Sequence, residues 1–103
     1  GKKPVFTPLP KFPEEQRDLA LVMSKEITCG EIEAVMKESC KYITKITLFD
    51  IYEGEQIAAD KKSMAFTVVF TPKDEAFTAD SVDAFVKKIL KNLKKKYDVD
   101  LRS

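Results

Sequence analysis

Alternation of strongly apolar and milder side chains marks the clearest strand of this chain, which covers residues 63–70. The strongly apolar set is Met64, Phe66, Val68 and Phe70. The intervening set is Ser63, Ala65, Thr67 and Val69. A period of two is typical of a strand with one face toward a core. The other face of this strand is therefore expected to stay open to a partner.

A second strand is predicted to precede it, beginning near residue 43, and a hairpin across residues 53–62 would pair the two strands antiparallel. Directly opposed residues of an antiparallel pair point to the same side of the sheet. Asp50 and Tyr52 are therefore expected beside Ala65 and Ser63. One carboxylate, one aromatic ring and one hydroxyl would then meet on the milder face.

The apolar alternation of this earlier strand is broken near Leu48. A β-bulge at that point would point the apolar residues on both sides of the break toward the core, and would turn Asp50 and Tyr52 outward. The residues expected to face the core are Ile46, Leu48, Phe49 and Ile51.

Two helices are predicted by apolar residues at steps of three and four. The first begins at Thr28, which has capping-box spacing to Glu31. Its apolar stripe is Cys29, Ile32, Val35, Met36 and Cys40. The second opens at Thr78, with Asp80 in its first turn. Its stripe is Val82, Phe85, Val86, Ile89, Leu90 and Leu93.

Two further strands complete the predicted order. Residues 17–24 are apolar on both faces, as expected for a central strand, and residues 97–102 alternate as an edge strand. The order β-α-β-β-α-β predicts an α+β, ferredoxin-like fold: a four-stranded antiparallel sheet with both helices on one face. The proline-rich residues 1–12 are expected to form a lead-in arm, and residues 13–103 the domain.

The length and composition favour a single domain with reduced cysteines and no overall charge bias. The chain has 103 residues, with 18 Lys and Arg against 17 Asp and Glu, so any RNA contact would be local. No run is long enough to cross a membrane, and neither a signal peptide nor an initiating Met is present. We therefore expect a fragment of a longer cytoplasmic protein. Cys29 and Cys40 would lie about 16 Å apart on one helix, too far for a disulfide.

Six lysines on the second helix invite an RNA-binding interpretation, but a solvated helix surface is the favoured one. They are Lys87, Lys88, Lys91, Lys94, Lys95 and Lys96.

Three segments, KFPEEQRDLALVMS, LFDIYEGEQI and KKSMAFTVVF, together resemble the C-terminal ferredoxin-fold anticodon-binding domain of the bacterial phenylalanyl-tRNA synthetase β subunit. The resemblance runs from about Pro10 to Arg102. Its most specific positions before the first strand are Lys11, Pro13, Arg17 and Asp18. Those around the hairpin loop are Phe49, Asp50, Tyr52, Gly54, Lys61, Lys62 and Ser63.

The resemblance implies a noncatalytic domain, without a cofactor of its own, that docks on the anticodon stem-loop of phenylalanine tRNA. The distant catalytic core would use ATP and magnesium, and the partners would be the tRNA, the rest of the β subunit and the α subunit. The residues implied to contact anticodon bases are Asp50, Tyr52, Ser63 and, more weakly, Ala20. Lys61 and Lys62 are candidates for phosphate contacts.

The chemistry of these side chains suits that role. A splayed base can stack on a tyrosine ring, which is worth roughly 1 to 3 kcal/mol per base, and the Asp50 carboxylate accepts only from base donors. Asp60 stands where many relatives have glycine. That departure is expected to alter the turn of the loop and to weaken phosphate attraction there.

Other interpretations stay open from the residues alone. Tyr52 could be ordinary half-buried packing, Asp50 could bond an exposed amide, and the two lysines could protect a hairpin end. An independent enzyme is disfavoured, because histidine and the common catalytic motifs are absent. Acylphosphatases share this topology, but residues 25–30 lack their phosphate cradle. A small-ligand regulatory or oligomerisation module of the same fold is the alternative.

Overall fold

The computed structural model describes residues 12–102, which fold in the predicted β-α-β-β-α-β order. The elements are β1 (Glu15–Ser24), α1 (Cys29–Ser39), β2 (Ile43–Tyr52), β3 (Lys61–Phe70), α2 (Ala79–Tyr97) and β4 (Asp100–Leu101). The predicted lead-in arm, residues 1–12, lies outside the described residues except for Phe12.

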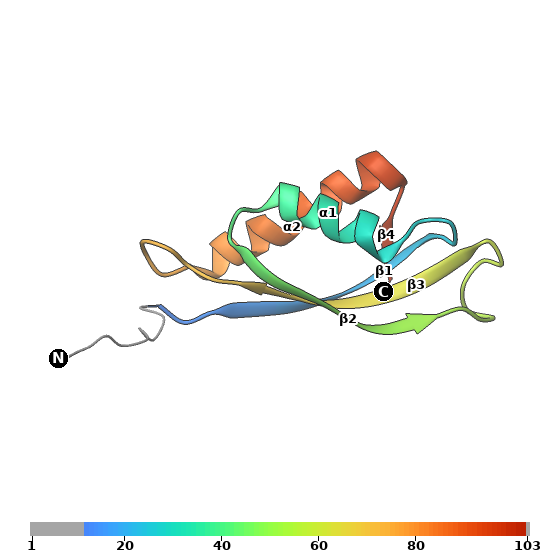
Figure 1. The fold of residues 1–103 in the computed structure, drawn as a ribbon, viewed down its shortest axis with the longest axis horizontal. Helices are drawn as coiled ribbons and strands as arrows, with labels where there is room; N and C mark the ends of the chain where they lie inside the picture. Colours follow the sequence, from blue (N-terminus) through green and yellow to red (C-terminus); the bar gives the residue numbers. More distant parts are fainter. Residues whose placement is uncertain (1–11, 103) are drawn as a thin grey trace.

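The strands form one antiparallel sheet in the order β2-β3-β1-β4. Both helices lie on the same face of this sheet, and the other face carries no helix (Figure 1). β1 is central, as its two apolar faces predicted. The predicted ferredoxin-like fold is thereby confirmed, and the sheet face away from the helices is here called the open face.

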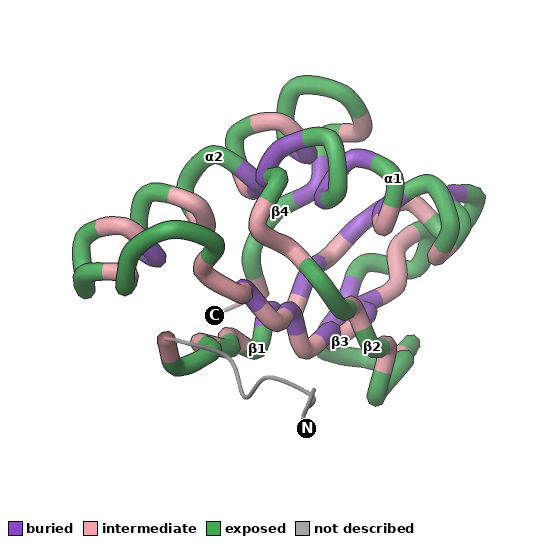
Figure 2. The backbone as a smooth tube through the Cα atoms, turned by 60° about the vertical axis from the view of Figure 1, so that its left-hand side comes forward, coloured by how far each residue is buried: buried purple, intermediate pink, exposed green. Residues whose placement is uncertain are grey.

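The core lies between the helix pair and the sheet, where the buried positions gather (Figure 2). The strongly apolar set of β3 is buried, as its alternation predicted. So are Ile32, Val35 and Met36 of the first helical stripe and Val82, Ile89 and Leu93 of the second, whose other members are partly buried. The largest fully buried side chains include Leu21, Met23, Ile32, Met36, Met64, Phe66, Phe70, Ile89 and Leu93.

The start of α1 is fixed by the predicted capping box. The Glu31 N–H donates to Thr28 Oγ1 over 3.1 Å, and the Thr28 N–H donates to Glu31 Oε1 over 2.9 Å. These reciprocal bonds satisfy amides that would otherwise lack helical partners. The bond from the Thr28 amide to the ionised carboxylate lowers the pKa of Glu31.

We expect Thr28→Ala to lower the free energy of unfolding by about 1 kcal/mol, because a helix N-cap is lost. Since the pKa of Glu31 is lowered in the folded state, its stabilising contribution is complete above the ordinary carboxyl pKa and is lost as the pH falls through the folded value. Urea unfolding should therefore show a larger deficit at neutral pH than at about pH 3. An equal deficit at both would contradict the hydrogen bond from the Thr28 hydroxyl to the Glu31 carboxylate, which this variant removes.

The last strand is shorter than predicted. Tyr97 is the final residue of α2, and only Asp100 and Leu101 are paired with β1. Between them Asp98 adopts a left-handed conformation, with φ 56° and ψ 38°, and its N–H donates to the carbonyls of the last helical turn. Lys94 Nζ contacts carboxylates of Asp98 at 2.8 Å and Asp100 at 2.9 Å. The helix end thus takes residues that alternation alone assigned to a strand.

The prediction that Phe49 and Ile51 join the core is wrong, although Ile51 has the parity of the helix side that the predicted bulge requires. The β-bulge near Leu48 is present, as a register shift between Leu48 and Asp50. Ile51 lies opposite Met64, which is buried, yet Ile51 is 57% exposed and Phe49 is 55% exposed. The physical reason is that β2 is an edge strand: Ile43, Ile46 and Leu48 pack against the core, but the end of the strand that carries Phe49 and Ile51 does not.

The two cysteines are unpaired, as predicted. Cys40, however, is the C-cap of α1 and not one of its helical residues. Burial and the nearby Glu33 carboxylate raise the pKa of the Cys29 thiol. The Cys29 thiol is therefore not activated as a nucleophile.

Candidate nucleic-acid interface

The predicted base-contact residues lie in two adjacent cross-strand rows of the open face. Across β2, β3 and β1, the first row contains Tyr52, Ser63 and Val22. The second row contains Asp50, Ala65 and Ala20. Opposed residues in an antiparallel sheet have Cβ atoms about 5 Å apart. The sheet register therefore brings all four candidates together, on the side away from the helices.

The Tyr52 ring is half-buried, and its contacts come from outside the helix layer. The guanidinium centre of Arg102 lies 4.9 Å from the ring centroid, close enough for a cation–π contact. At the hydroxyl end the ring approaches Gly54 so closely that a Cβ there would clash with the Tyr52 oxygen. Glycine at this position serves to leave room for the ring in its present place and not to adopt a special backbone conformation, because Gly54 does not have a positive φ.

We expect Gly54→Ala to displace the Tyr52 ring while changing stability little, because the atom in the way is the far end of a half-exposed side chain. The ring proton chemical shifts of Tyr52 should move. Gly30→Ala is the matched control, since its added Cβ would meet nothing nearer than Thr28 Oγ1 at 4.0 Å. Unchanged Tyr52 ring shifts in Gly54→Ala would contradict the close packing.

Ser63 is only 3% exposed, so the open face is less open at this point than its alternation predicted. Its hydroxyl makes no side-chain hydrogen bond to any residue from 12 to 102. The loop after β2 also buries one apolar side chain, Ile57, which is not part of the main core. A base could reach the Ser63 hydroxyl only after nearby side chains move.

Asp50 is exposed and, within residues 12–102, has neither an ion-pair partner nor a hydrogen-bond partner for its carboxylate. The alternative role of bonding a nearby amide is therefore not what the described residues show. Ala20, two strands away, is partly exposed and presents only a methyl group. A flat group could thus lie over Ala20 and Ala65 while a donor on its edge reaches Asp50.

The two phosphate candidates lie on different sides of the sheet. Lys61 shares the parity of Ser63. Lys62 instead lies opposite Met23, on the helix side, where its charge acts to lower the pKa of the nearby Cys29 against the stronger effect of burial. Of the two lysines, therefore, only Lys61 is on the same side of the sheet as the base-contact candidates.

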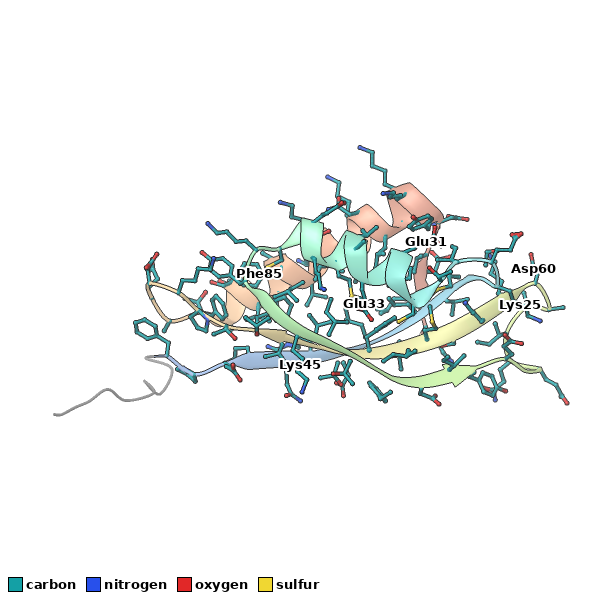
Figure 3. All side chains as sticks on the ribbon, viewed as in Figure 1. Lys25, Glu31, Glu33, Lys45, Asp60 and Phe85 are labelled. Atoms are coloured by element: carbon teal, nitrogen blue, oxygen red, sulfur yellow. The ribbon has the colours of Figure 1, made fainter. Side chains whose placement is uncertain are left out.

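Sequence reasoning missed Lys45 and Arg102. Lys45 lies opposite Val69 on the open face and is exposed (Figure 3). Simple alternation along the strand does not predict which face Lys45 is on, because a second register shift lies between residues 43 and 45. Arg102 reaches the site only through the pairing of β4 with β1, which no local pattern indicates.

The α2 lysines are all exposed, and α2 lies on the opposite side of the sheet from the open face.

Asp60, at the hairpin end (Figure 3), accepts a hydrogen bond at its carbonyl from the Lys25 N–H over 3.2 Å. Among the described non-glycine residues only Asp98 has a positive φ, so the turn at Asp60 does not require glycine.

Comparison with known families agrees with this geometry. Residues 10–102 match the family described as the ferredoxin-fold anticodon binding domain. The chain belongs to this family. The domain has the family's fold, and its open face carries the residues discussed above.

Curated relatives extend the comparison. The chain is 40% identical over 99 residues to the phenylalanine–tRNA ligase beta subunit of Lactococcus lactis and 39% identical over 99 residues to that of Bacillus subtilis. In both cases the match covers 95% of this chain but 12% of the relative. The chain therefore spans about one eighth of the length of these curated relatives.

Within residues 12–102, neither helix is long and apolar enough to cross a bilayer. The same residues contain no group of three or more side chains arranged to hold a metal ion.

Proposed function

We propose that this chain is the anticodon-reading domain of a phenylalanine–tRNA ligase beta subunit and that its open face binds the anticodon stem-loop of phenylalanine tRNA. The observation that carries the proposal is the convergence of Tyr52, Asp50, Ser63 and Ala20 from three strands onto one face, in a member of the anticodon-binding family. That face has no helix over it.

Each side chain has a role that follows from its chemistry. Tyr52 stacks on an unstacked base, and the free Asp50 carboxylate accepts a hydrogen bond from an amino or imino donor on a base edge. Ser63 gives or takes one further bond, and Ala20 forms part of the floor. Lys61 supplies positive charge for phosphate, while Lys62 can do so only for a strand that passes the hairpin toward the helix side.

The rest of the activity belongs to parts of the protein beyond this domain. Attachment of phenylalanine to tRNA, with ATP and magnesium, is assigned to the remainder of the beta subunit together with an alpha subunit, in the cytoplasm. This domain contributes binding energy and selection, and it carries no catalytic residue.

Equilibrium binding tests the proposal. The 103-residue chain is titrated into a fluorescent anticodon stem-loop of phenylalanine tRNA, and into the same stem-loop with its three anticodon bases changed. We expect about tenfold or greater preference for the cognate loop, because losing hydrogen bonds to base edges costs about 1 to 3 kcal/mol per position. Equal binding of both loops would contradict anticodon reading.

The alternative, a small-ligand regulatory or oligomerisation module, makes a different prediction. It requires self-association, together with a metabolite whose binding shifts signals of the sheet in the absence of RNA. Sedimentation of the chain with and without the stem-loop distinguishes the two: we expect a monomer that forms a one-to-one RNA complex, and a stable dimer unaffected by RNA would favour the alternative.

A further inference from the structure

Arg102 spans the open face from one edge of the sheet to the other. Its backbone N–H donates to the Ala20 carbonyl over 2.7 Å, which extends β4 along β1. Its guanidinium lies over the Tyr52 ring of β2, and Nη2 donates to Gln56 Oε1 over 3.2 Å. The side chain must therefore cross β1 and β3 near Ser63, in agreement with the low exposure of that residue.

The charge of Arg102 is not neutralised by an acid. Within the described residues its partners are an aromatic ring and a neutral amide. By contrast, Arg17 pairs with the Glu15 carboxylate at 3.5 Å. A guanidinium with only weak contacts, among residues proposed to bind RNA, is positioned for an anion that is not part of the protein.

We propose that Arg102 is a further RNA-contacting residue: its guanidinium leaves the Tyr52 ring for a backbone phosphate of the anticodon loop, and a base takes the ring face it had covered. This inference rests on the function proposed above. The exchange is favourable because a guanidinium binds phosphate through two parallel, charge-assisted hydrogen bonds. The same movement uncovers the Ser63 hydroxyl.

The test compares Arg102→Gln with Arg17→Gln, which removes the same charge from the only other arginine of the chain. Stem-loop affinity is measured over a range of salt concentrations. We expect Arg102→Gln to lose about tenfold in affinity and to reduce the slope of log affinity against log salt by about 0.7, the value for one single-strand phosphate contact. Arg17→Gln should change affinity by less than about twofold.

A second measurement needs no variant. In the NMR spectrum of the unmodified chain, the Arg102 Nε–H and the Tyr52 ring protons should shift together as the stem-loop is added. Lack of stem-loop binding by the unmodified chain would defeat the proposed function itself. If the unmodified chain binds but Arg102→Gln binds as tightly or more tightly, or the Arg102 Nε–H does not move at saturation, only the inference about Arg102 is overturned.

Discussion

Phe66→Ala should lower the free energy of unfolding by about 3 to 5 kcal/mol, which is a large part of the 5 to 15 kcal/mol typical of a domain. Phe66 has no exposed surface and lies on the helix side of β3, paired with Leu19 on β1 and Leu48 on β2. Truncation leaves a cavity between three strands and the helices, and a close-packed core cannot fill it by small shifts.

Urea unfolding followed by circular dichroism measures this loss. Phe49→Ala is the matched control, because it deletes the same side chain from a site that is 55% exposed. We expect that control to cost under about 1 kcal/mol, since little apolar surface returns to water. Equal costs for the two variants would show that Phe49 packs in a core after all.

Tyr52→Ala should weaken binding of the anticodon stem-loop by roughly 5- to 150-fold, the equivalent of 1 to 3 kcal/mol of base stacking. The ring is the only aromatic side chain in the two cross-strand rows of the site. Tyr52→Phe should keep most of the affinity, because the stacking surface remains. Fluorescence anisotropy at one fixed salt concentration measures all of these affinities.

Tyr97→Ala provides the control for removing a tyrosine from the surface. Tyr97 ends α2, on the helix side of the sheet, and its hydroxyl donates weakly to Glu31 Oε2 over 3.4 Å. Its loss should leave RNA affinity unchanged. If Tyr97→Ala weakens binding as much as a correctly folded Tyr52→Ala, the RNA does not lie on the open face.

Local patterns predicted the parts of the fold in which the burial of a residue follows from its neighbours along the chain. The alternation in β3 and the stripe of α2 each identified the face of the element that packs against the core. The Thr28 capping box was predictable for the same reason, since all its atoms lie within one turn. Even the bulge in β2 followed from its broken alternation.

The errors arose where burial depends on distant parts of the chain. Phe49 and Ile51 have the pattern of core residues, but their exposure depends on how far the helix layer extends over an edge strand. Leu101 alternates with Asp100 as a strand residue should, yet it is 54% exposed on the other edge. Alternation in the sequence specifies which face of the sheet a residue is on, while tertiary packing decides whether other elements bury it.

The candidate site was predictable to a similar degree. Parity and hairpin closure placed Asp50 and Tyr52 beside Ala65 and Ser63, and the register agrees. The contact of Arg102 with the Tyr52 ring joins residues 50 positions apart through two strand pairings, so no short motif contains it. Nor could the sequence show that Ser63 is nearly buried, because its position in an alternating strand gives the side of the sheet and not what covers it.

The central claim is that RNA binds the sheet face away from the helices. Amide chemical-shift mapping of the unmodified chain during titration with the phenylalanine anticodon stem-loop tests it most directly. The account predicts that the largest shifts fall on Ala20, Asp50, Tyr52, Ser63 and Arg102, with α1 and α2 little changed. If the largest shifts fall on the exposed lysines of α2 and the amides of the open face do not shift, the central claim is contradicted.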